Sequence, residues 1–273
     1  MKTLYVSDMD GTLLGADSQL SPTTTSLLSE AIRGGALFTV ATARTPATAV
    51  PLLAGLPLML PLIVLSGAAC WDTRQALFSN VMALAPDTIR AIDDIMRRHG
   101  LRPLIYRHTG SQLHVYHYGA MHPAEQQFIN QRLHTSKLFH LSAPDYATAP
   151  GDAIVCLAMN EYERLEAVHA DVNANVECRA LLSRDLFDPA IGLLEIYATG
   201  ATKAQAIRRL ADELDAERIV VFGDNINDIE MMQAASVAVA VQNAIPEVRD
   251  IASTVIGPNT DDSVARYILA HTK

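Results

Sequence analysis

Two aspartates, Asp8 and Asp10, stand one residue apart at the end of the apolar run 3–7. Carboxylates this close in sequence disfavour each other's charged form, so a compensating group is needed. A hard divalent cation provides it, because Mg²⁺ binds a few carboxylate oxygens and keeps several waters. A carboxylate beside such a cation can attack phosphorus, and a second can act as an acid and then as a base. The pair therefore indicates phosphoryl-transfer chemistry.

Other polar residues follow the later apolar runs in the same way. Ligands of parallel α/β sheets bind outside the carboxyl ends of the strands, so these residues are expected to meet there. Asp224 would complete a Mg²⁺ site with Asp8 and Asp10, while Lys203 and Thr42 would supply donors for a bound phosphate. The residues expected at this edge are Asp8, Asp10, Thr42, Arg44, Ser66, Gly67, Lys203, Asp224, Asn227 and Asp228.

The elements that must position these residues alternate between strands and helices. Ser21 fits a helix N-cap with Pro22 at the first helical position. The nearly continuous apolar run 36–42 is typical of a strand buried on both faces of a parallel sheet. The same alternation resumes in the last third of the chain. We predict a doubly wound, Rossmann-like parallel-sheet α/β core made of residues 1–81 and 189–273.

Residues 82–188 differ in character, since they hold eight of the nine histidines. Their helix and strand patterns predict a separate α/β layer of mixed strands, inserted into the core as a cap domain that sets substrate specificity. Alternation along a strand would place His114, Tyr116 and Tyr118 on one face, where they would contact substrate. His114 and His117 would point to opposite faces, which argues against a zinc site in this stretch.

Composition excludes several classes of partner. The 273-residue chain carries a formal net charge of −9, whereas a nucleic-acid-binding surface is basic. Its three cysteines, Cys70, Cys156 and Cys178, are widely spaced and suggest neither a disulfide framework nor a metal knuckle. No secretory signal is visible, because Asp8 and Asp10 interrupt the apolar run near the N-terminus. We therefore predict a cytoplasmic protein. Nothing in the sequence specifies an oligomeric state.

One uncharged stretch, from Thr45 to Trp71, is long enough to cross a bilayer as a helix. Pro51, Pro57 and Pro61 would each interrupt that helix and remove a backbone donor where lipid offers no replacement. A short helix to about Ala54, a turn and a buried strand explain the same residues. We therefore predict no membrane partner.

Four segments resemble the motifs of the haloacid dehalogenase (HAD) superfamily: the run DMDGTLL from Asp8, the run VATAR that ends at Arg44, Lys203, and the run GDNINDIEMM from Gly223. The length and place of the insertion resemble the Cof-type branch, phosphatases with a large α/β cap. The resemblance covers nearly the whole chain. It is specific because the two acidic motifs occur together, some two hundred residues apart.

The resemblance implies a role for each matching residue. Asp8 would be the nucleophile and Asp10 the general acid/base. Asp224 would ligate Mg²⁺ with Asp8 and the main-chain carbonyl of Asp10, and Asp228 would orient a metal-bound water. The residues implied for phosphate binding are Thr42, Lys203, Asn227, Arg44 and Asn243. Arg44 has an alternative, because it could instead pair with an acidic side chain.

The chain departs from the family pattern at the edge of the phosphate site. Ala43 and Ser66 stand where the family often has glycine and asparagine, and Asp261 to Ser263 replace a pattern that usually contains glycine. None of these departures touches the acidic positions. They concern the shape of the phosphate-binding edge and the choice of substrate.

The leading hypothesis is a Mg²⁺-dependent phosphatase that hydrolyses small phosphorylated metabolites, of the sugar phosphate, flavin mononucleotide or pyridoxal phosphate type, through an aspartyl-phosphate. A phosphomutase would use the same nucleophile but pass the phosphoryl group to a second hydroxyl. A signalling module would carry phosphoaspartate as a mark. Multiple turnover of p-nitrophenyl phosphate would separate the first hypothesis from the other two.

Overall fold

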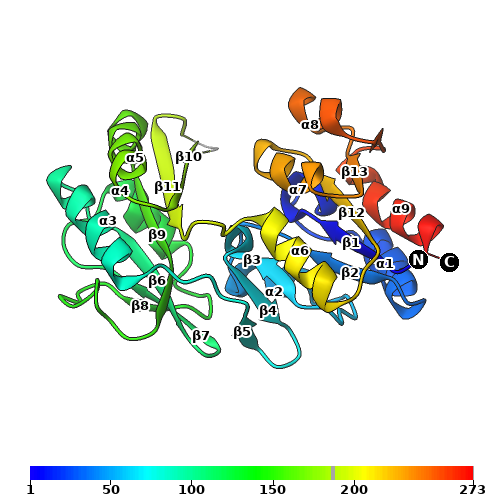
Figure 1. Ribbon diagram of the computed structural model, residues 1–273, viewed down its shortest axis with the longest axis horizontal. Coiled ribbons are helices and arrows are strands. Elements are labelled where there is room, and N and C mark those ends of the chain that lie inside the picture. The colour runs from blue at the N-terminus through cyan, green and yellow to red at the C-terminus, as the bar shows by residue number, and fades with distance from the viewer. Residues whose placement is uncertain (186–187, 273) are drawn as a thin grey trace. The chain divides into compact units, whose positions relative to one another are not determined.

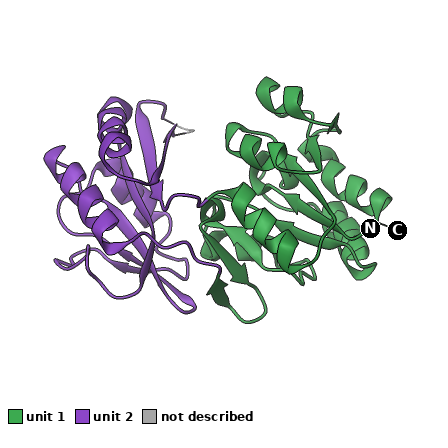
Figure 2. Cartoon of the chain, in the orientation of Figure 1, with its two compact units in different colours: residues 1–79, 202–273 green, residues 80–201 purple. Residues whose placement is uncertain are grey.

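The computed structural model describes residues 1–185 and 188–272. They form two compact units, residues 1–79 with 202–273 and residues 80–201 (Figure 2). The sequence placed the second boundary at residue 188, whereas the chain leaves the second unit only after residue 201. The reason is strand β11 (Ile191–Tyr197), which pairs with β9 (Asp152–Glu161) and β10 (Arg179–Arg184) of the second unit.

The first unit is built on a five-stranded parallel sheet with helices on both faces (Figure 1). Its strand order is β14 (Thr254–Val255), β13 (Val237–Ala240), β12 (Arg218–Gly223), β1 (Thr3–Ser7) and β2 (Leu37–Val40). The central strands are almost entirely buried and apolar, which is what helices on both faces require. The predicted doubly wound α/β class is confirmed.

The helices of this unit begin at residues suited to helix starts. Helix α1 (Pro22–Arg33) starts at a proline, and the Ser21 hydroxyl caps it by accepting a hydrogen bond from the Thr24 N–H at 2.9 Å. It packs against the last helix, α9. On another part of the unit, α6 packs against α7. The remaining helices are α2 (Pro46–Leu53), α6 (Lys203–Glu213), α7 (Ile229–Gln233), α8 (Pro246–Ile251) and α9 (Ser263–His271).

The third predicted strand lies beside the main sheet. Strand β3 (Leu62–Val64) forms a three-stranded antiparallel sheet with β4 (Ala69–Asp72) and β5 (Leu77–Ser79). A single parallel bridge, Ala41 to Ile63, joins it to the chain after β2. The uncharged stretch 45–71 thus holds α2 and β3, and no helix among the described residues is both long and apolar enough to cross a bilayer.

The second unit is a six-stranded mixed sheet packed against helices. Its strand order is β10, β11, β9, β6 (Leu104–Thr109), β7 (Gln112–Tyr116) and β8 (Leu138–His140). All pairs are antiparallel except β7 with β8. Helices α3 (Pro86–Arg98) and α5 (Tyr162–Asn175) contribute Ile92, Met96, Val168 and Val172 to its buried core. The third helix is α4 (Pro123–Asn130).

The histidine-rich stretch is held by packing within this unit. The rings of His114 and Tyr116 stack on one face, and both stack on His140 of β8. His117 instead lies fully buried with Nδ1 3.3 Å from the Pro103 carbonyl oxygen, so it does not meet His114. Tyr118 follows the end of β7 and is 46% exposed, so strand alternation does not extend to it.

Gly67 sets the distance between the turn after β3 and the start of α6. Its φ is +92°, and a Cβ on it would lie 2.2 Å from the Thr202 carbonyl oxygen. Thr202 caps α6 by accepting the Gln205 N–H at 3.1 Å. Only glycine permits this close approach of two backbones.

We therefore expect Gly67→Ala to lower the free energy of unfolding by about 3 kcal/mol, since the backbone must shift and adopt a strained φ. Gly35→Ala is the matched control, because Gly35 has φ +101° but nothing within 4 Å of its Cβ position. The control should lose about 1 kcal/mol from φ strain alone. Urea unfolding of both variants measures the difference, and equal losses would contradict a steric role for Gly67.

Candidate active site

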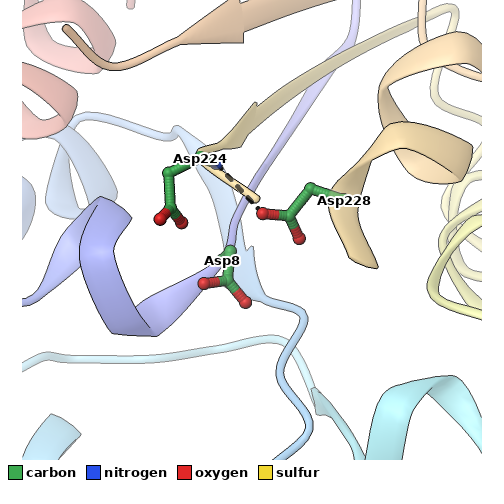
Figure 3. A group of neighbouring side chains, drawn as sticks. All are labelled: Asp8, Asp224 and Asp228. Atoms are coloured by element: carbon green, nitrogen blue, oxygen red, sulfur yellow. Dashed lines mark hydrogen bonds between the residues drawn. The ribbon is translucent and has the colours of Figure 1, made fainter. Parts of the chain in front are cut away.

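The carboxyl ends of neighbouring parallel strands bring the predicted acidic residues together. Asp8 directly follows β1, and Asp224 directly follows β12, its partner in the sheet. One ligand oxygen from each of Asp8, Asp224 and Asp228 lies within 4.8 Å of the others. Figure 3 shows the three side chains around a common space. Asp8 and Asp228 are buried, and Asp224 is half-buried.

Asp228 is fixed by the backbone of the turn that follows β12. Its Oδ2 accepts hydrogen bonds from the N–H groups of Asp224 at 3.0 Å and Asn225 at 3.2 Å (Figure 3 draws the first). Gly223 makes room for it, because a Cβ on this glycine would lie 2.6 Å from the Asp228 Cβ. The fully buried carboxylate thus satisfies the first N–H groups beyond the strand.

Lys203, the first residue of α6, supplies a positive charge to the cluster. Its Nζ donates to Asp8 Oδ1 at 2.6 Å and to Asp228 Oδ1 at 2.8 Å. The Lys203 side chain is 4% exposed, so both ion pairs are buried. One ammonium faces three carboxylates, which leaves the cluster with an excess of negative charge. Chemically, this arrangement can accept a cation and still present one donor to an anion.

The charge imbalance changes the pKa values of the cluster. Burial raises the pKa of Asp8 to about 7, with Asp228 and Asp224 adding to the rise and Lys203 opposing it. Burial also raises the pKa of Asp224 to about 6, against the hydrogen bond from Thr12. Burial alone would lower the pKa of Lys203, but Asp8 and Asp228 raise it above its usual value, so the ammonium stays charged. These pKa shifts indicate that the one ammonium group does not balance the negative charge of the three carboxylates.

Gly11 and Thr12 explain the spacing of the first motif. The Thr12 hydroxyl donates to Asp224 Oδ1 at 2.7 Å and thereby orients that carboxylate. Gly11 has φ +79°, and a Cβ on it would lie 2.4 Å from Asp224 Oδ2. A glycine between Asp10 and Thr12 is therefore required for Asp224 to approach. Thr12 is not among the site residues expected from the sequence, although the DGT triplet carries that signal.

Asp10 lies outside the cluster of three carboxylates and pairs with Arg44. The guanidinium donates from Nε to Asp10 Oδ2 at 2.7 Å and from Nη2 to Asp10 Oδ1 at 2.6 Å. This two-bond fork fixes the plane of the carboxylate, which is 51% exposed. The pairing of Arg44 with an acidic side chain, which the sequence left open, is the arrangement in this structure.

The remaining predicted residues lie around the cluster without contacting it through side-chain bonds. Thr42 is buried, and its Oγ1 accepts the Arg44 N–H at 3.2 Å. Asn243 donates to the Gly11 carbonyl at 2.7 Å and accepts the Asn259 N–H at 3.0 Å, so it ties the first motif to a distant loop. Asn227 is exposed, and its side chain makes no hydrogen bond within the described part of the chain.

Comparison with known proteins agrees with this geometry. A family model of haloacid dehalogenase-like hydrolases matches residues 5–268. An HMP-PP phosphatase of Serratia proteamaculans is 28% identical over 98% of this chain and 94% of its own length. The pyridoxal phosphate phosphatase YbhA of Escherichia coli is 26% identical over 97% of this chain and 96% of its own.

The fold is also found among solved structures. A haloacid dehalogenase-like hydrolase from Bacteroides thetaiotaomicron superposes with a TM-score of 0.76, at 20% identity and with 98% of each chain covered. At the level of the family, these likenesses support the enzyme class expected from the motifs, a phosphoric monoester hydrolase. The match over almost the whole chain confirms the resemblance drawn from the motifs: the chain belongs to the haloacid dehalogenase-like hydrolases.

Proposed function

We propose that the chain is a Mg²⁺-dependent phosphatase of small phosphorylated metabolites. The observation that carries this proposal is the buried cluster in which the Lys203 ammonium contacts Asp8 and Asp228 while Asp224 lies opposite. A nucleophile, a cation site and a hydrogen-bond donor for phosphate thereby lie together at one edge of the sheet. The phosphatase names of the relatives support the same reaction class.

The donor set fits Mg²⁺. Its side-chain ligands are all carboxylate oxygens, and the cluster carries more negative than positive charge. Asp8 and Asp224 would hold the ion together with the main-chain carbonyl of Asp10, and Asp228 would orient a water bound to it. When bound, Mg²⁺ would neutralise charge on the phosphoryl oxygens.

The reaction divides between two carboxylates. An Asp8 oxygen attacks phosphorus and displaces the alcohol of the substrate, which forms an aspartyl-phosphate and breaks the P–O bond to the leaving group. Asp10 gives its proton to the leaving oxygen and later takes one from the water that hydrolyses the acyl phosphate. Lys203 holds the phosphoryl oxygens throughout, and in this structure Arg44 holds Asp10 in its unprotonated form through its two hydrogen bonds. The products are an alcohol and inorganic phosphate.

The molecule that accepts the phosphoryl group from the aspartyl-phosphate distinguishes this proposal from its alternatives. A phosphomutase would protect the aspartyl-phosphate from water, and a signalling module would keep it as a mark. The relatives named above act on HMP-PP and on pyridoxal phosphate, according to their names. We therefore propose water as the acceptor and small phosphorylated metabolites of this size as substrates.

Asp8→Asn should abolish turnover of p-nitrophenyl phosphate with Mg²⁺, because an amide does not attack phosphorus. The fold should remain, since the amide is nearly the same size as the carboxylate. Asp212→Asn, an exposed aspartate on α6, is the matched control and should keep full activity. Release of p-nitrophenol over many turnovers measures both. Steady-state activity in a clean Asp8→Asn preparation would refute the assignment of the nucleophile.

Mg²⁺ should stabilise the fold more strongly at about pH 8 than at about pH 5. The raised pKa values of Asp8, about 7, and Asp224, about 6, mean that the folded, metal-free chain holds protons that the unfolded chain has released. The contribution of these two carboxyls to stability is therefore greatest below their unfolded pKa and is lost as pH rises through 6 to 7. A bound cation replaces the missing protons and reverses that loss.

Urea unfolding with Mg²⁺ or with chelator at both pH values measures this effect. At a Mg²⁺ concentration of about 100 times its Kd the gain should be about 2.7 kcal/mol. Asp224→Asn should lose most of the gain. An equal gain at both pH values would show that the carboxylates do not bind the ion, and chelator-resistant hydrolysis would count against the whole site.

We further propose that residues 80–201 set specificity while the first unit supplies the chemistry. Every residue with a catalytic role in this proposal belongs to the first unit. Among the predicted contacts His114 and Tyr116 are engaged in a ring stack, which leaves Tyr118 as the most exposed. Tyr118→Ala should raise KM for the best metabolite substrate several-fold and leave kcat/KM for p-nitrophenyl phosphate nearly unchanged.

Leu133→Ala provides the control, because Leu133 is another exposed apolar residue of the same unit. Leu133→Ala should change KM and kcat/KM for neither substrate. Steady-state kinetics with both substrates makes the comparison. An equal fall of kcat/KM for the two substrates in Tyr118→Ala would argue against the division of roles between the units.

A further inference from the structure

The second unit contains an interrupted strand ladder at one end of its sheet. Strand β6 begins at Leu104, opposite Leu157, whereas β9 continues to Glu161. Pro103 cannot extend the ladder, because proline has no N–H. The Met159 N–H donates instead to Oε1 of Glu125, at 3.2 Å. A side chain from α4 thus takes the place of a strand carbonyl, and the space beside β9 is left open.

A cavity of about 230 Å³ occupies this end of the sheet. It is lined by the segment before β6, the turn that starts α4, the last residues of β9 and the first turn of α5. The chain enters and leaves the unit near the other end of β9, where the Leu84 N–H bonds the Ala153 carbonyl. All lining residues belong to the second unit, and none is part of the candidate active site.

Two guanidinium groups line the cavity without a carboxylate partner. Arg164 donates from Nη2 at 2.7 Å and from Nε at 3.3 Å to the His99 carbonyl oxygen, which carries no full charge. Arg102 makes neither a hydrogen bond nor an ion pair with any described residue, although it is half-buried. Its side chain lies along Gly119, where a Cβ would be 3.5 Å from Cγ. The Arg102 charge is therefore available to a ligand, and Arg164, whose charge also acts on the nearby Glu161, adds a second guanidinium group.

Buried polar groups also line the cavity. Asn160 is 3% exposed, and its Oδ1 accepts the Glu161 N–H at 3.1 Å. Its Nδ2 donates to no group in the described part of the chain and is not sealed from solvent, so it can reach a ligand in the cavity. Glu125 is 4% exposed and receives one backbone N–H on each oxygen, from Met159 and from His122. The cavity thus offers an accessible amide donor and two guanidinium groups.

We propose that this cavity is a second ligand site, which binds a small organic anion. The carboxylate or phosphate of the ligand pairs with Arg102 and Arg164, because the planar guanidinium matches both groups with two parallel hydrogen bonds. An acceptor atom of the ligand takes the Nδ2 donor of Asn160. The volume exceeds that of several waters, at about 30 Å³ each, and suits a metabolite rather than a drug-sized molecule.

Calorimetric titration of the full chain with inorganic phosphate and, separately, with succinate tests the proposal. Chelator is present throughout, so that Mg²⁺ does not recruit phosphate to the first unit. Binding of at least one probe should weaken tenfold or more in Arg102→Gln, a variant that breaks no side-chain hydrogen bond or ion pair among the described residues. Arg164→Gln should weaken the same probe. The two probes decide whether the site takes phosphates or carboxylates.

Two controls locate the binding. Arg97→Gln removes the same charge from an exposed position on α3 and should leave the affinity unchanged. Asp8→Asn alters the candidate active site and should also leave it unchanged. The proposal is overturned if neither probe binds the wild-type chain. It is equally overturned if binding survives in Arg102→Gln, or falls as much in Arg97→Gln as in Arg102→Gln.

Discussion

The buried contact of Lys203 with Asp8 and Asp228 is the interaction on which the first unit depends. Charges removed from water are costly unless they are paired and hydrogen-bonded, so the three side chains must meet with good geometry. They come from the end of β1, the start of α6 and the turn after β12. Only adjacent parallel strands with a helix start above them bring these distant segments together.

Several smaller features serve this contact. Gly67 lets the turn after β3 approach the Thr202 carbonyl and so fixes where α6 begins. Gly11 lets Asp224 approach the first motif, and Gly223 leaves room for Asp228. Each glycine stands where a Cβ would collide with a group of the cluster or with its support. The positions of the glycines therefore follow from electrostatics as much as from chain geometry.

The second unit handles buried charge in a different way. Arg107 is 5% exposed, and it donates to two backbone carbonyls, of Gly151 at 2.8 Å and Ala147 at 2.7 Å. Burial raises the pKa of Glu125 to about 7, so that this carboxyl can bind a proton near neutral pH. Arg107 and Glu125 are thus satisfied by backbone groups, whereas Lys203 and Asp8 of the first unit are satisfied by opposite charge.

The sequence by itself determined the fold class, the alternation of strands and helices in the first unit, and the acidic residues that gather beyond β1 and β12. These depend on local signals: apolar runs, proline and serine at helix starts, and motifs whose residues lie close together in sequence. The tertiary structure alone decided the partner of Arg44, the removal of β3 from the main sheet and the place of β11 in the second unit. It also decided the cavity beside β9, where Glu125 meets Met159. Each of these depends on which distant segments pair, and pairing is settled by packing and hydrogen bonding across the whole unit rather than by neighbours in sequence.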